Sequence, residues 1–401
     1  MRIVYFTHSL RSCWNHGNAH FLRGVLSELI ERGHDVRVFE PEGAWSLTNL
    51  VKDHGEQGLE RYRTAYPELS SRTYSRLEEG AAQAWGADLV IVHEWNDPEL
   101  VAAVGRLRAR GGRFSLLFHD THHRAVSAPH EMRAYDLGAY DGVLAFGATL
   151  ARVYQRWGWG DRVFVWHEAA DTRRFHPFPP RNGEGAHPKH GGGGVEQGSD
   201  PPPSALRADT SPRAGRRGLV WIGTWGDGER SQEIADYLLK PARDAELPLD
   251  VYGVRYPEEA KRKLRDYGAR YHGWIANAAA PEVFAKHLAT VHVPRRFYTQ
   301  VLPGIPTIRV FEALACGIPL VSAPWDDCEH LFRVGEDFLM VGDGAEMTAA
   351  LRDLKRDPGL RNSLVRSGLE TIRTRHTCAH RVDELLSIVE RMRAPELESA
   401  A

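Results

Sequence analysis

Short apolar runs that alternate with amphipathic helical stretches are the feature that most limits how this chain can fold. An apolar run at residues 2–7 is followed by a helical apolar face between Phe21 and Ile30, and then by a second run at residues 35–39. A strand, a helix and a strand in this order form a βαβ unit with parallel strands. The alternation continues with apolar runs at residues 89–93, 114–119, 142–146 and 163–166. The sequence therefore predicts an α/β fold, with a doubly wound, Rossmann-like parallel sheet over residues 1–176.

Residues 177–217 interrupt this pattern. They contain a run of glycines at 191–194 and a run of prolines at 201–203, with almost no bulky apolar residues. A segment of this composition cannot support a packed core and predicts a disordered linker or insertion. The strand and helix pattern then restarts, with apolar runs at residues 219–222, 249–252, 270–274 and 290–293. We therefore expect a second Rossmann-like domain over residues 218–375, followed by a C-terminal helix within residues 376–401.

Charge and composition exclude several classes of protein. Lys and Arg number 51 against 53 Asp and Glu. The chain thus has no excess of basic residues, and its charge does not indicate a nucleic acid or membrane partner. No apolar run approaches the roughly 18 residues of a membrane span, and no secretory signal precedes the first strand, so we expect a cytoplasmic protein. The cysteines lack metal-ligand spacing, which predicts reduced thiols and no bound metal. They are Cys13, Cys316, Cys328 and Cys378. The loop at residues 7–20 lacks the Gly-x-Gly-x-x-Gly of a dinucleotide site, and we expect no cofactor.

Residues 303–322 predict a loop, a short helix, a sharp stop and a buried strand. Thr307 is placed to cap the helix and Gly317 to end it. Arg309 and Glu312 fall on one helix face, separate from the apolar face. A helix N-terminus offers free N–H groups to a phosphate, and a nearby carboxylate can accept both hydroxyls of a ribose. The stretch therefore indicates a site for a nucleotide diphosphate; the alternative is an ordinary exposed ion pair.

A longer string around this helix resembles a known family. It runs Arg-x-Phe-Glu-x-x-Ala-Cys-Gly-x-Pro-x-Val-Ser from Arg309, and is followed by Glu329 and by Gly-Glu-Asp-Phe at residues 335–338. This string resembles the C-terminal signature of GT-B glycosyltransferases, and in particular of the spore-maturation, CgeB-like glycosyltransferases. The resemblance covers residues 218–375 best and the first half only by its architecture. Many retaining relatives carry a first glutamate eight residues before the second, and Gly304 stands at that place here.

The resemblance implies two Rossmann-like domains that face a central cleft, with the last helix packing back on the first domain. A dimer helix is the alternative for that last element. The nucleotide-sugar donor is expected at the N–H groups of Thr307 and Ile308, beside Arg309, with its ribose on Glu312. The loop at Gly273 and Trp274 is expected beside the nucleobase. Arg295 is expected to reach the diphosphate or the sugar, against the alternative of a solvated basic turn.

A glycine-rich loop opens the second domain. Gly223 and Thr224 follow the apolar run at 219–222, and Arg230 comes at the opening of the next helix. Glycine permits close approach of a phosphate, and Arg230 can neutralise the charge that grows on a departing diphosphate. We therefore assign Arg230 to catalysis as well as binding. The loop lacks the Gly-Lys-Ser/Thr of a P-loop, so a plain turn between strand and helix is the alternative.

Polar clusters at strand ends predict the acceptor side of the cleft. The loop between the first strand and helix carries His16, Asn18 and His20, and Glu94 follows the run at 89–93. His119 and Asp120 end the run at 114–119, and they are the candidates for moving or positioning a proton of the acceptor hydroxyl. For the loop the alternative is a plain surface segment. For Asp120 the alternative is a helix cap or the holding of a histidine tautomer.

The sequence thus predicts a glycosyltransferase that moves a sugar from a nucleotide diphosphate, with UDP as the expected carrier, to an acceptor hydroxyl. The resemblance favours retention of the anomeric configuration and catalysis without a metal. A nucleotide-sugar epimerase of the same fold and a non-catalytic sugar-nucleotide-binding or spore-surface protein are the alternatives. A small metabolite, a polysaccharide and a protein all remain open as acceptor, and the oligomeric state is open too.

Overall fold

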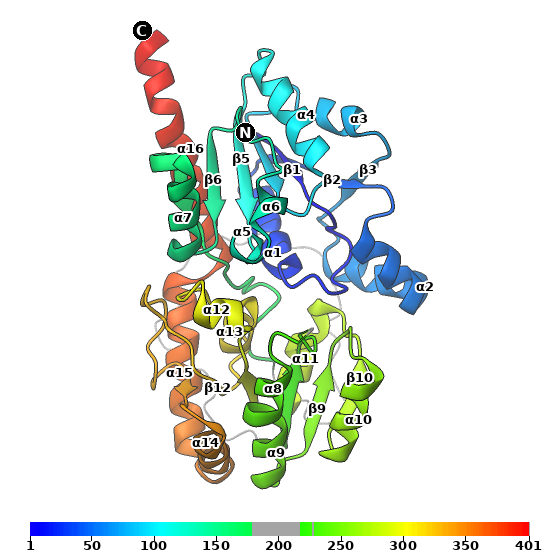
Figure 1. The fold of residues 1–401 in the computed structure, drawn as a ribbon, viewed down its shortest axis with the longest axis vertical. Coiled ribbons are helices and arrows are strands. Elements are labelled where there is room, and N and C mark those ends of the chain that lie inside the picture. Colours follow the sequence, from blue (N-terminus) through cyan, green and yellow to red (C-terminus); the bar gives the residue numbers. More distant parts are fainter. Residues whose placement is uncertain (179–216, 227, 401) are drawn as a thin grey trace, which may run out of the picture.

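The computed structural model describes residues 1–178, 217–226 and 228–400, so the linker predicted at 177–217 lies almost wholly outside the described residues. Figure 1 shows two lobes stacked along the long axis, the upper one holding the N-terminus and the lower one β8 to β13. None of the helices in the described ranges combines the length and apolar content needed to cross a bilayer.

The first domain is built on a seven-stranded sheet with the order β3-β2-β1-β4-β5-β6-β7, and all of its strand pairs are parallel. The central strand β4 is buried along its whole length, as expected for a parallel strand covered on both faces. The strands are β1 (Arg2–Phe6), β2 (Asp35–Pro41), β3 (Ser71–Tyr74), β4 (Leu89–His93), β5 (Ser115–Asp120), β6 (Gly142–Ala145) and β7 (Val163–Val165).

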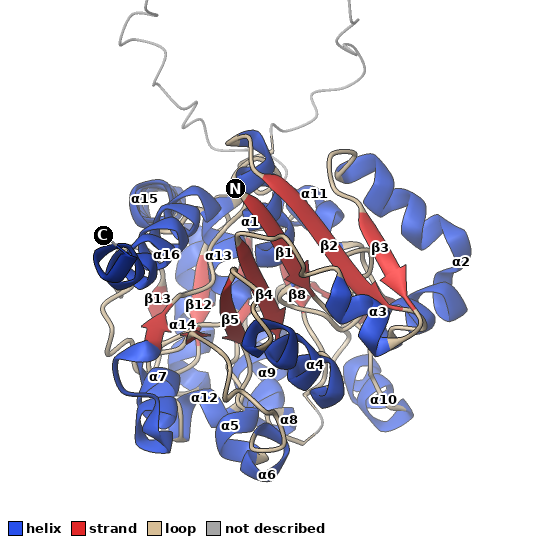
Figure 2. Cartoon of the chain, turned by 90° about the horizontal axis from the view of Figure 1, so that it is seen from above, coloured by secondary structure: helices blue, strands red, loops and turns tan. Residues whose placement is uncertain are grey.

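Helices cover both faces of this sheet, which Figure 2 shows from above. One hydrophobic cluster lies under α1 and a second under α4 and α7. The helices are α1 (Ala19–Glu31), α2 (Trp45–Ala65), α3 (Leu77–Ala82), α4 (Pro98–Ala109), α5 (Arg124–Ser127), α6 (Pro129–Met132) and α7 (Ala148–Tyr154). A π-helical turn at Gln155–Trp159 and a 3-10 turn at Gly160–Arg162 follow α7.

The second domain repeats the plan with a six-stranded parallel sheet of order β10-β9-β8-β11-β12-β13. Its strands are β8 (Leu219–Ile222), β9 (Leu249–Tyr252), β10 (Arg270–Gly273), β11 (Ala289–His292), β12 (Leu320–Ser322) and β13 (Leu339–Met340). Its helices are α8 (Ser231–Ile234), α9 (Lys240–Asp244), α10 (Glu258–Asp266), α11 (Ala280–Lys286), α12 (Arg296–Gln300), α13 (Ile308–Ala315), α14 (Gly344–Arg356) and α15 (Pro358–Arg375). A π-helical turn at Ala235–Leu239 joins α8 to α9, and a 3-10 turn at Asn277–Ala279 precedes α11.

The last helix, α16 (Cys378–Ala400), returns from the second domain to the first and runs up the left-hand side of Figure 1. It packs against α1 and β5, and the indole nitrogen of Trp166 donates a hydrogen bond to the Arg381 carbonyl at 2.8 Å. Apolar residues of α1, α13 and α16 belong to one continuous cluster. The hydrophobic core is therefore continuous from one domain to the other.

The predicted fold class is confirmed, since two parallel Rossmann-like sheets stand at the expected residues. The sequence did not indicate β3, because only Tyr74 of its residues is buried and an edge strand needs little apolar pattern. Gly317 ends α13 with a φ of +61°, a conformation that favours glycine.

Candidate active site

The candidate site lies where the strand order reverses in each sheet. In the first sheet β1 neighbours β4, and in the second sheet β8 neighbours β11. The loops that leave two such strands diverge and open a crevice at the carboxyl ends, where α/β proteins bind ligands. The two crevices face each other, because His20 lies 3.3 Å from Glu312 and His123 lies 3.7 Å from Glu229 across the domains.

Glu312, on α13, contacts groups of both domains. Its carboxylate accepts hydrogen bonds from Arg309 and, at 2.7 Å, from Nδ2 of Asn277. Nε2 of His20 accepts from the backbone N–H of Asp171 at 2.8 Å, which leaves Nδ1, beside Glu312, to carry the ring proton. Burial raises the pKa of Glu312, whereas the Arg309 charge lowers it. Arg309 and Glu312 thus share one helix face, as a buried pair rather than an exposed one.

The side chain of Thr307 does not cap α13, contrary to the sequence expectation. Its hydroxyl is instead hydrogen-bonded with Nε2 of His292 at 3.2 Å, because that buried ring offers a competing partner. The first N–H groups of the helix are therefore left for another acceptor, including that of Ile308.

Glu168, in the segment that leaves the first domain, meets this helix N-terminus. Its carboxylate lies close enough to the Ile308 N–H and to Glu312 for both groups to affect its pKa. Burial, and then the charge of Glu312, raise the pKa of Glu168 to about 8. A carboxylate here occupies a position suited to a phosphate. Nothing local in the sequence connects Glu168 with α13, so sequence reasoning gave it no role.

The structure explains why position 304 is a glycine and not a glutamate. Gly304 has a φ of +91°, and a Cβ there would lie 2.6 Å from the sulfur of Cys328, so a glutamate does not fit. An oxygen of Glu329 lies 3.4 Å from the same Cβ position. The Glu329 carboxylate accepts a hydrogen bond from the Ala148 N–H at 2.8 Å and is bonded with His167 at 2.9 Å. A carboxylate is thus present at this corner, but it joins the second domain to the first.

Arg230 is buried without a carboxylate partner. It is 8% exposed, and it donates hydrogen bonds to the carbonyls of Val293 and Thr224, each at 3.0 Å. Among the described residues no carboxylate forms an ion pair with it. Burial, and then the charge of Arg295, lower its pKa to about 10. Arg295 contacts the Thr224 hydroxyl at 3.3 Å and pairs with Glu229 at 2.7 Å, so it is not a free solvated turn.

The loops expected beside the nucleobase lie at the domain junction. Gly273 has a φ of +73°, and its carbonyl accepts a hydrogen bond from the Gly253 N–H at 2.7 Å. The ring of Trp274 lies 4.6 Å from that of His54, which belongs to the first domain, and its indole nitrogen is buried without a partner. The Gly223 carbonyl accepts from the hydroxyl of Tyr256. Contact of Gly273 and Trp274 with a base stays a prediction.

Glu94 and Asp120 form a buried carboxylate pair at the ends of β4 and β5. Arg124 donates to Glu94 at 2.9 Å, and the hydroxyl of Tyr154 donates to Asp120 at 2.7 Å. Burial raises the pKa of Glu94 to about 8, with a further contribution from Asp120, and raises that of Asp120 to about 6. Asp120 also accepts from the backbone N–H of His122, two residues on, but no side chain caps the following helix α5.

His119 lies on the opposite side of the sheet from Asp120, because successive residues of a strand alternate. Its Nδ1 is bonded with the Tyr5 hydroxyl at 2.7 Å, and its Nε2 is buried without a partner. Its ring centroid lies 5.3 Å from that of His93, which is bonded with Asn18 at 2.9 Å. Burial lowers the pKa of His119 to about 3, so its ring is neutral. His119 and Asp120 therefore leave opposite faces of the sheet, and contact of His119 and the two carboxylates with one ligand stays a prediction.

His16 and His20, expected together on the acceptor side, lie in different parts of the cleft. His16 packs against His8 with ring centroids 4.1 Å apart, and its Nε2 is buried without a partner. His20 lies within α1 against Glu312 and so belongs with the expected donor side. Within the described part of the chain, no group of three or more His, Cys, Asp or Glu residues is arranged to hold a metal ion.

Comparisons with known proteins point to the same class in both halves. The model of glycosyltransferase family 4 matches residues 17–174, and a glycosyl transferase-like model matches residues 230–387. No curated protein sequence matches the chain.

Solved structures share the fold along nearly the whole chain. HepE from Anabaena, in complex with UDP and glucose, has a TM-score of 0.65 and 13% identity, covering 98% of this chain and 100% of its own. An alpha-glucosyltransferase in complex with UDP and a 13-mer DNA has a TM-score of 0.65 and 11% identity, covering 97% and 100%. A T4 phage BGT variant in complex with UDP-glucose has a TM-score of 0.56 and 12% identity, covering 97% and 99%. Each domain thus matches a glycosyltransferase model, and the chain has the GT-B fold of these solved glycosyltransferases.

Proposed function

We propose that this glycosyltransferase moves a sugar from a UDP-sugar to the hydroxyl of an acceptor, as a CgeB-like member of its family. The observation that carries the proposal is the buried guanidinium of Arg230, which no described carboxylate neutralises. Burying an unpaired charge is costly, so a site that does so favours an anionic ligand. HepE and the alpha-glucosyltransferase were solved with UDP in complex, which supports a nucleotide diphosphate as that ligand.

The donor site is assigned to α13 and the loops facing it. The first N–H groups of α13 and the positive end of the helix dipole receive the diphosphate in place of the Glu168 carboxyl, and Glu312 takes the ribose hydroxyls. Glu312 exchanges its bond to Asn277 or Arg309 for the ribose, which keeps a buried carboxylate satisfied. Trp274 and the backbone at Gly273 lie beside the base.

Arg230 and Arg295 act on the leaving group. When the bond between the anomeric carbon and the β-phosphate oxygen breaks, negative charge grows on the diphosphate, and fixed guanidinium groups stabilise it. This charge takes the place that a metal ion fills in other transferases, so we propose catalysis without a metal. The bond from the acceptor oxygen to the anomeric carbon forms at the same centre, with retention of configuration proposed for the step.

The acceptor side is assigned to the first-domain crevice. The unpartnered Nε2 of His119 can hydrogen-bond a hydroxyl of the bound sugar or acceptor, while Tyr5 holds the other ring nitrogen. Asn18 and His16 lie on the same side, and Glu94 with Asp120 offers carboxylates for the acceptor proton.

Incubation with UDP-sugars tests the function directly. We expect release of UDP from one of them, faster in the presence of a hydroxyl acceptor and undiminished by EDTA. Interconversion of the sugar without loss of UDP would instead identify an epimerase, and binding of UDP-sugar without either reaction would identify a non-catalytic binding protein.

Substitution of Glu312 tests the ribose assignment. Glu312→Gln loses a charge-assisted pair, which typically contributes about 1.5–3 kcal/mol, so we expect UDP to bind roughly ten- to a hundred-fold more weakly in calorimetry. Glu282→Gln removes an exposed carboxylate of the same domain and serves as the control. Equal UDP affinity of the two variants would rule out the assignment.

Substitution of Arg230 separates binding from catalysis. Because its charge acts mainly on the transition state, Arg230→Ala should lower kcat by roughly 10²-fold with a smaller effect on UDP-sugar affinity. Arg230→Lys should retain only part of the turnover that the alanine variant loses, because an ammonium cannot form bidentate contacts with phosphate oxygens. Full turnover of the alanine variant with only a raised KM would make Arg230 a binding residue.

The raised pKa of Glu168 predicts a pH dependence of donor binding. Below about pH 8 the carboxyl is protonated, whereas above it a negative charge stands at the proposed phosphate position. UDP affinity should therefore fall between pH 7 and pH 9, by at most about tenfold for one titrating group. Glu168→Gln should bind UDP with nearly constant affinity over this range. An unchanged decline in the variant would show that another group causes it.

A further inference from the structure

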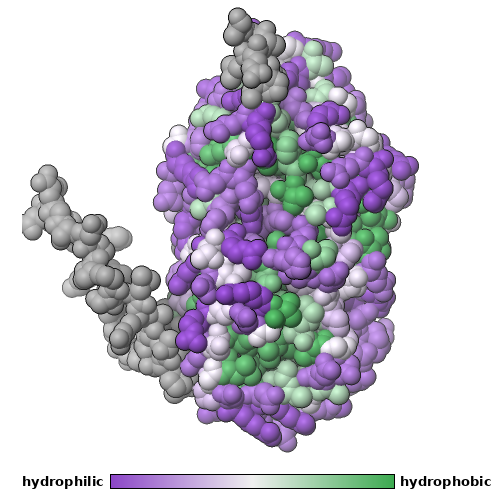
Figure 3. All heavy atoms as spheres, turned by 90° about the vertical axis from the view of Figure 1, so that its left-hand side faces the viewer, coloured by the Kyte–Doolittle hydropathy of each residue, from purple (hydrophilic) through white to green (hydrophobic). Residues whose placement is uncertain are grey.

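Two adjoining hollows lie on the first domain, outside the cleft. The larger has a volume of about 530 Å³ and the smaller about 410 Å³, and Gly138 and Arg162 line both. The larger is lined by Met132, Arg133, Tyr135, Leu137, Gly138, Tyr154, Arg156, Trp157, Trp159 and Arg162. Figure 3 shows the side of the molecule that carries α7 and α16, where hydrophobic residues lie exposed between hydrophilic ones in the upper lobe.

The larger hollow combines three arginines with two tryptophans. The guanidinium of Arg133 lies 5.4 Å from the Trp157 ring, and that of Arg162 lies 4.5 Å from the Trp159 ring. Within the described residues, none of the three arginines (Arg133, Arg156 and Arg162) forms an ion pair with a carboxylate. The wall is therefore positively charged and lacks internal neutralisation, which favours an anionic occupant.

The local backbone is irregular where it presents these tryptophans. The chain leaves α7 through the π-helical turn at Gln155–Trp159, a rare conformation that is frequent at functional sites. Gly158 and Gly160 both have positive φ, at +96° and +54°, which bulky residues avoid. Trp157 and Trp159 are half-exposed, and both line the hollow.

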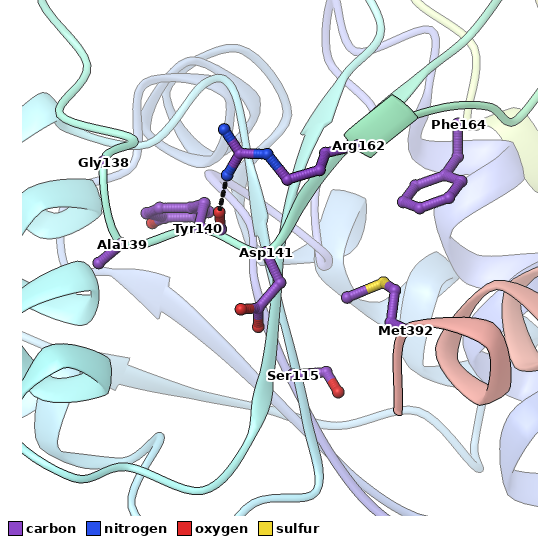
Figure 4. Close-up of a pocket in the computed structure, with 8 residues that line it drawn as sticks. All are labelled: Ser115, Gly138, Ala139, Tyr140, Asp141, Arg162, Phe164 and Met392. Carbon is purple, nitrogen blue, oxygen red and sulfur yellow. Dashed lines mark hydrogen bonds between the residues drawn. The ribbon is translucent and has the colours of Figure 1, made fainter. Parts of the chain in front are cut away.

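Two polar side chains line the smaller hollow: Asp141, which accepts from the Leu116 N–H at 2.7 Å, and Ser115, which accepts from Arg393 at 3.3 Å. Figure 4 shows Arg162 reaching the Tyr140 carbonyl, to which it donates at 3.2 Å, while Asp141 and Ser115 lie below it and Phe164 and Met392 lie at the side. The two hollows together form an extended, open surface of mixed polar and apolar groups, which suits a chain molecule better than a small ligand.

The back wall separates this surface from the cleft. Tyr154 lines the larger hollow, and its hydroxyl donates inward to Asp120 at 2.7 Å. Tyr135 also lines it, and its hydroxyl donates to the Glu94 carbonyl. The hollow thus lies one tyrosine side chain behind the carboxylate pair and is distinct from the donor site.

We propose that these hollows bind an anionic sugar chain. The arginines take its carboxylate or sulfate groups, the tryptophan rings pack on the apolar faces of the sugar rings, and Asp141 with Ser115 receives hydroxyls. The choice of a saccharide rests on the proposed function, whereas the choice of an anion rests on the arginines alone. A polymeric acceptor held here is bound by the same domain that carries the acceptor crevice.

Calorimetry with tetragalacturonate, a linear chain of uronic acids, and neutral maltotetraose tests the proposal on the full chain. We expect tetragalacturonate to bind at least tenfold more tightly than maltotetraose. The triple variant Arg133→Ala, Arg156→Ala, Arg162→Ala should lose at least tenfold in affinity for it. The control triple Arg61→Ala, Arg110→Ala, Arg366→Ala removes the same charge at exposed sites elsewhere and should bind as the unmodified chain does. Arg156→Glu, at an exposed side chain of the larger hollow, should also weaken binding.

Equal affinity of the two triple variants for tetragalacturonate would overturn the proposal. Tight binding of maltotetraose that is the same in the unmodified chain and in both triple variants would overturn it too. Displacement of tetragalacturonate by equimolar inorganic phosphate would reduce the site to an anion site and contradict the saccharide assignment. A third outcome would assign the surface to a membrane: the unmodified chain binds anionic vesicles but not tetragalacturonate, and the variant lacking Arg133, Arg156 and Arg162 does not bind the vesicles. This result would also overturn the proposal. UDP titration of the same samples reports on the donor site separately, so failure of one proposal is distinguishable from failure of the other.

Discussion

The bonds around Glu312 are the point on which the two-domain arrangement depends. This buried carboxylate, from α13 of the second domain, meets Arg309 and Asn277 of its own domain and His20 of the first. A buried carboxylate is costly unless its oxygens are satisfied, so the position of α1 and that of α13 are fixed relative to each other. The continuous apolar cluster of α1, α13 and α16 supports the same contact. Any ligand that takes a bond from Glu312 therefore affects both domains at once.

Electrostatics divides the cleft into two unlike halves. The second-domain side gathers Arg230, Arg295 and Arg309 around the N-terminus of α13, where helix dipole and guanidinium charge act in the same direction. The first-domain side is lined by buried imidazoles, and burial lowers the pKa values of His93 and His119 so that both rings are neutral. An anionic diphosphate and an uncharged hydroxyl compound have complementary partners in such a cleft. This division agrees with transfer of a sugar between them.

The sequence predicted the parts of the site that depend on local periodicity. The helical spacing placed Arg309 and Glu312 on one face, and the apolar runs located the strand ends that carry Glu94 and His119. It could not predict that His20 meets Glu312 or that Glu168 reaches Ile308, because these contacts join segments from different domains. The two-residue period of a strand places His119 and Asp120 on opposite faces of the sheet. The role of Glu329 near Gly304 needed the fold itself.

A crystal structure of the chain with UDP tests the central claim most directly. The account predicts the ribose hydroxyls within hydrogen-bond distance, about 2.6–3.2 Å, of Glu312, with the diphosphate at the N-terminus of α13 and against Arg230. It also predicts that the Glu168 carboxyl has left the Ile308 N–H. A nucleotide bound elsewhere, with Glu312 still bonded to both Asn277 and Arg309 and no phosphate near Arg230, would contradict the account.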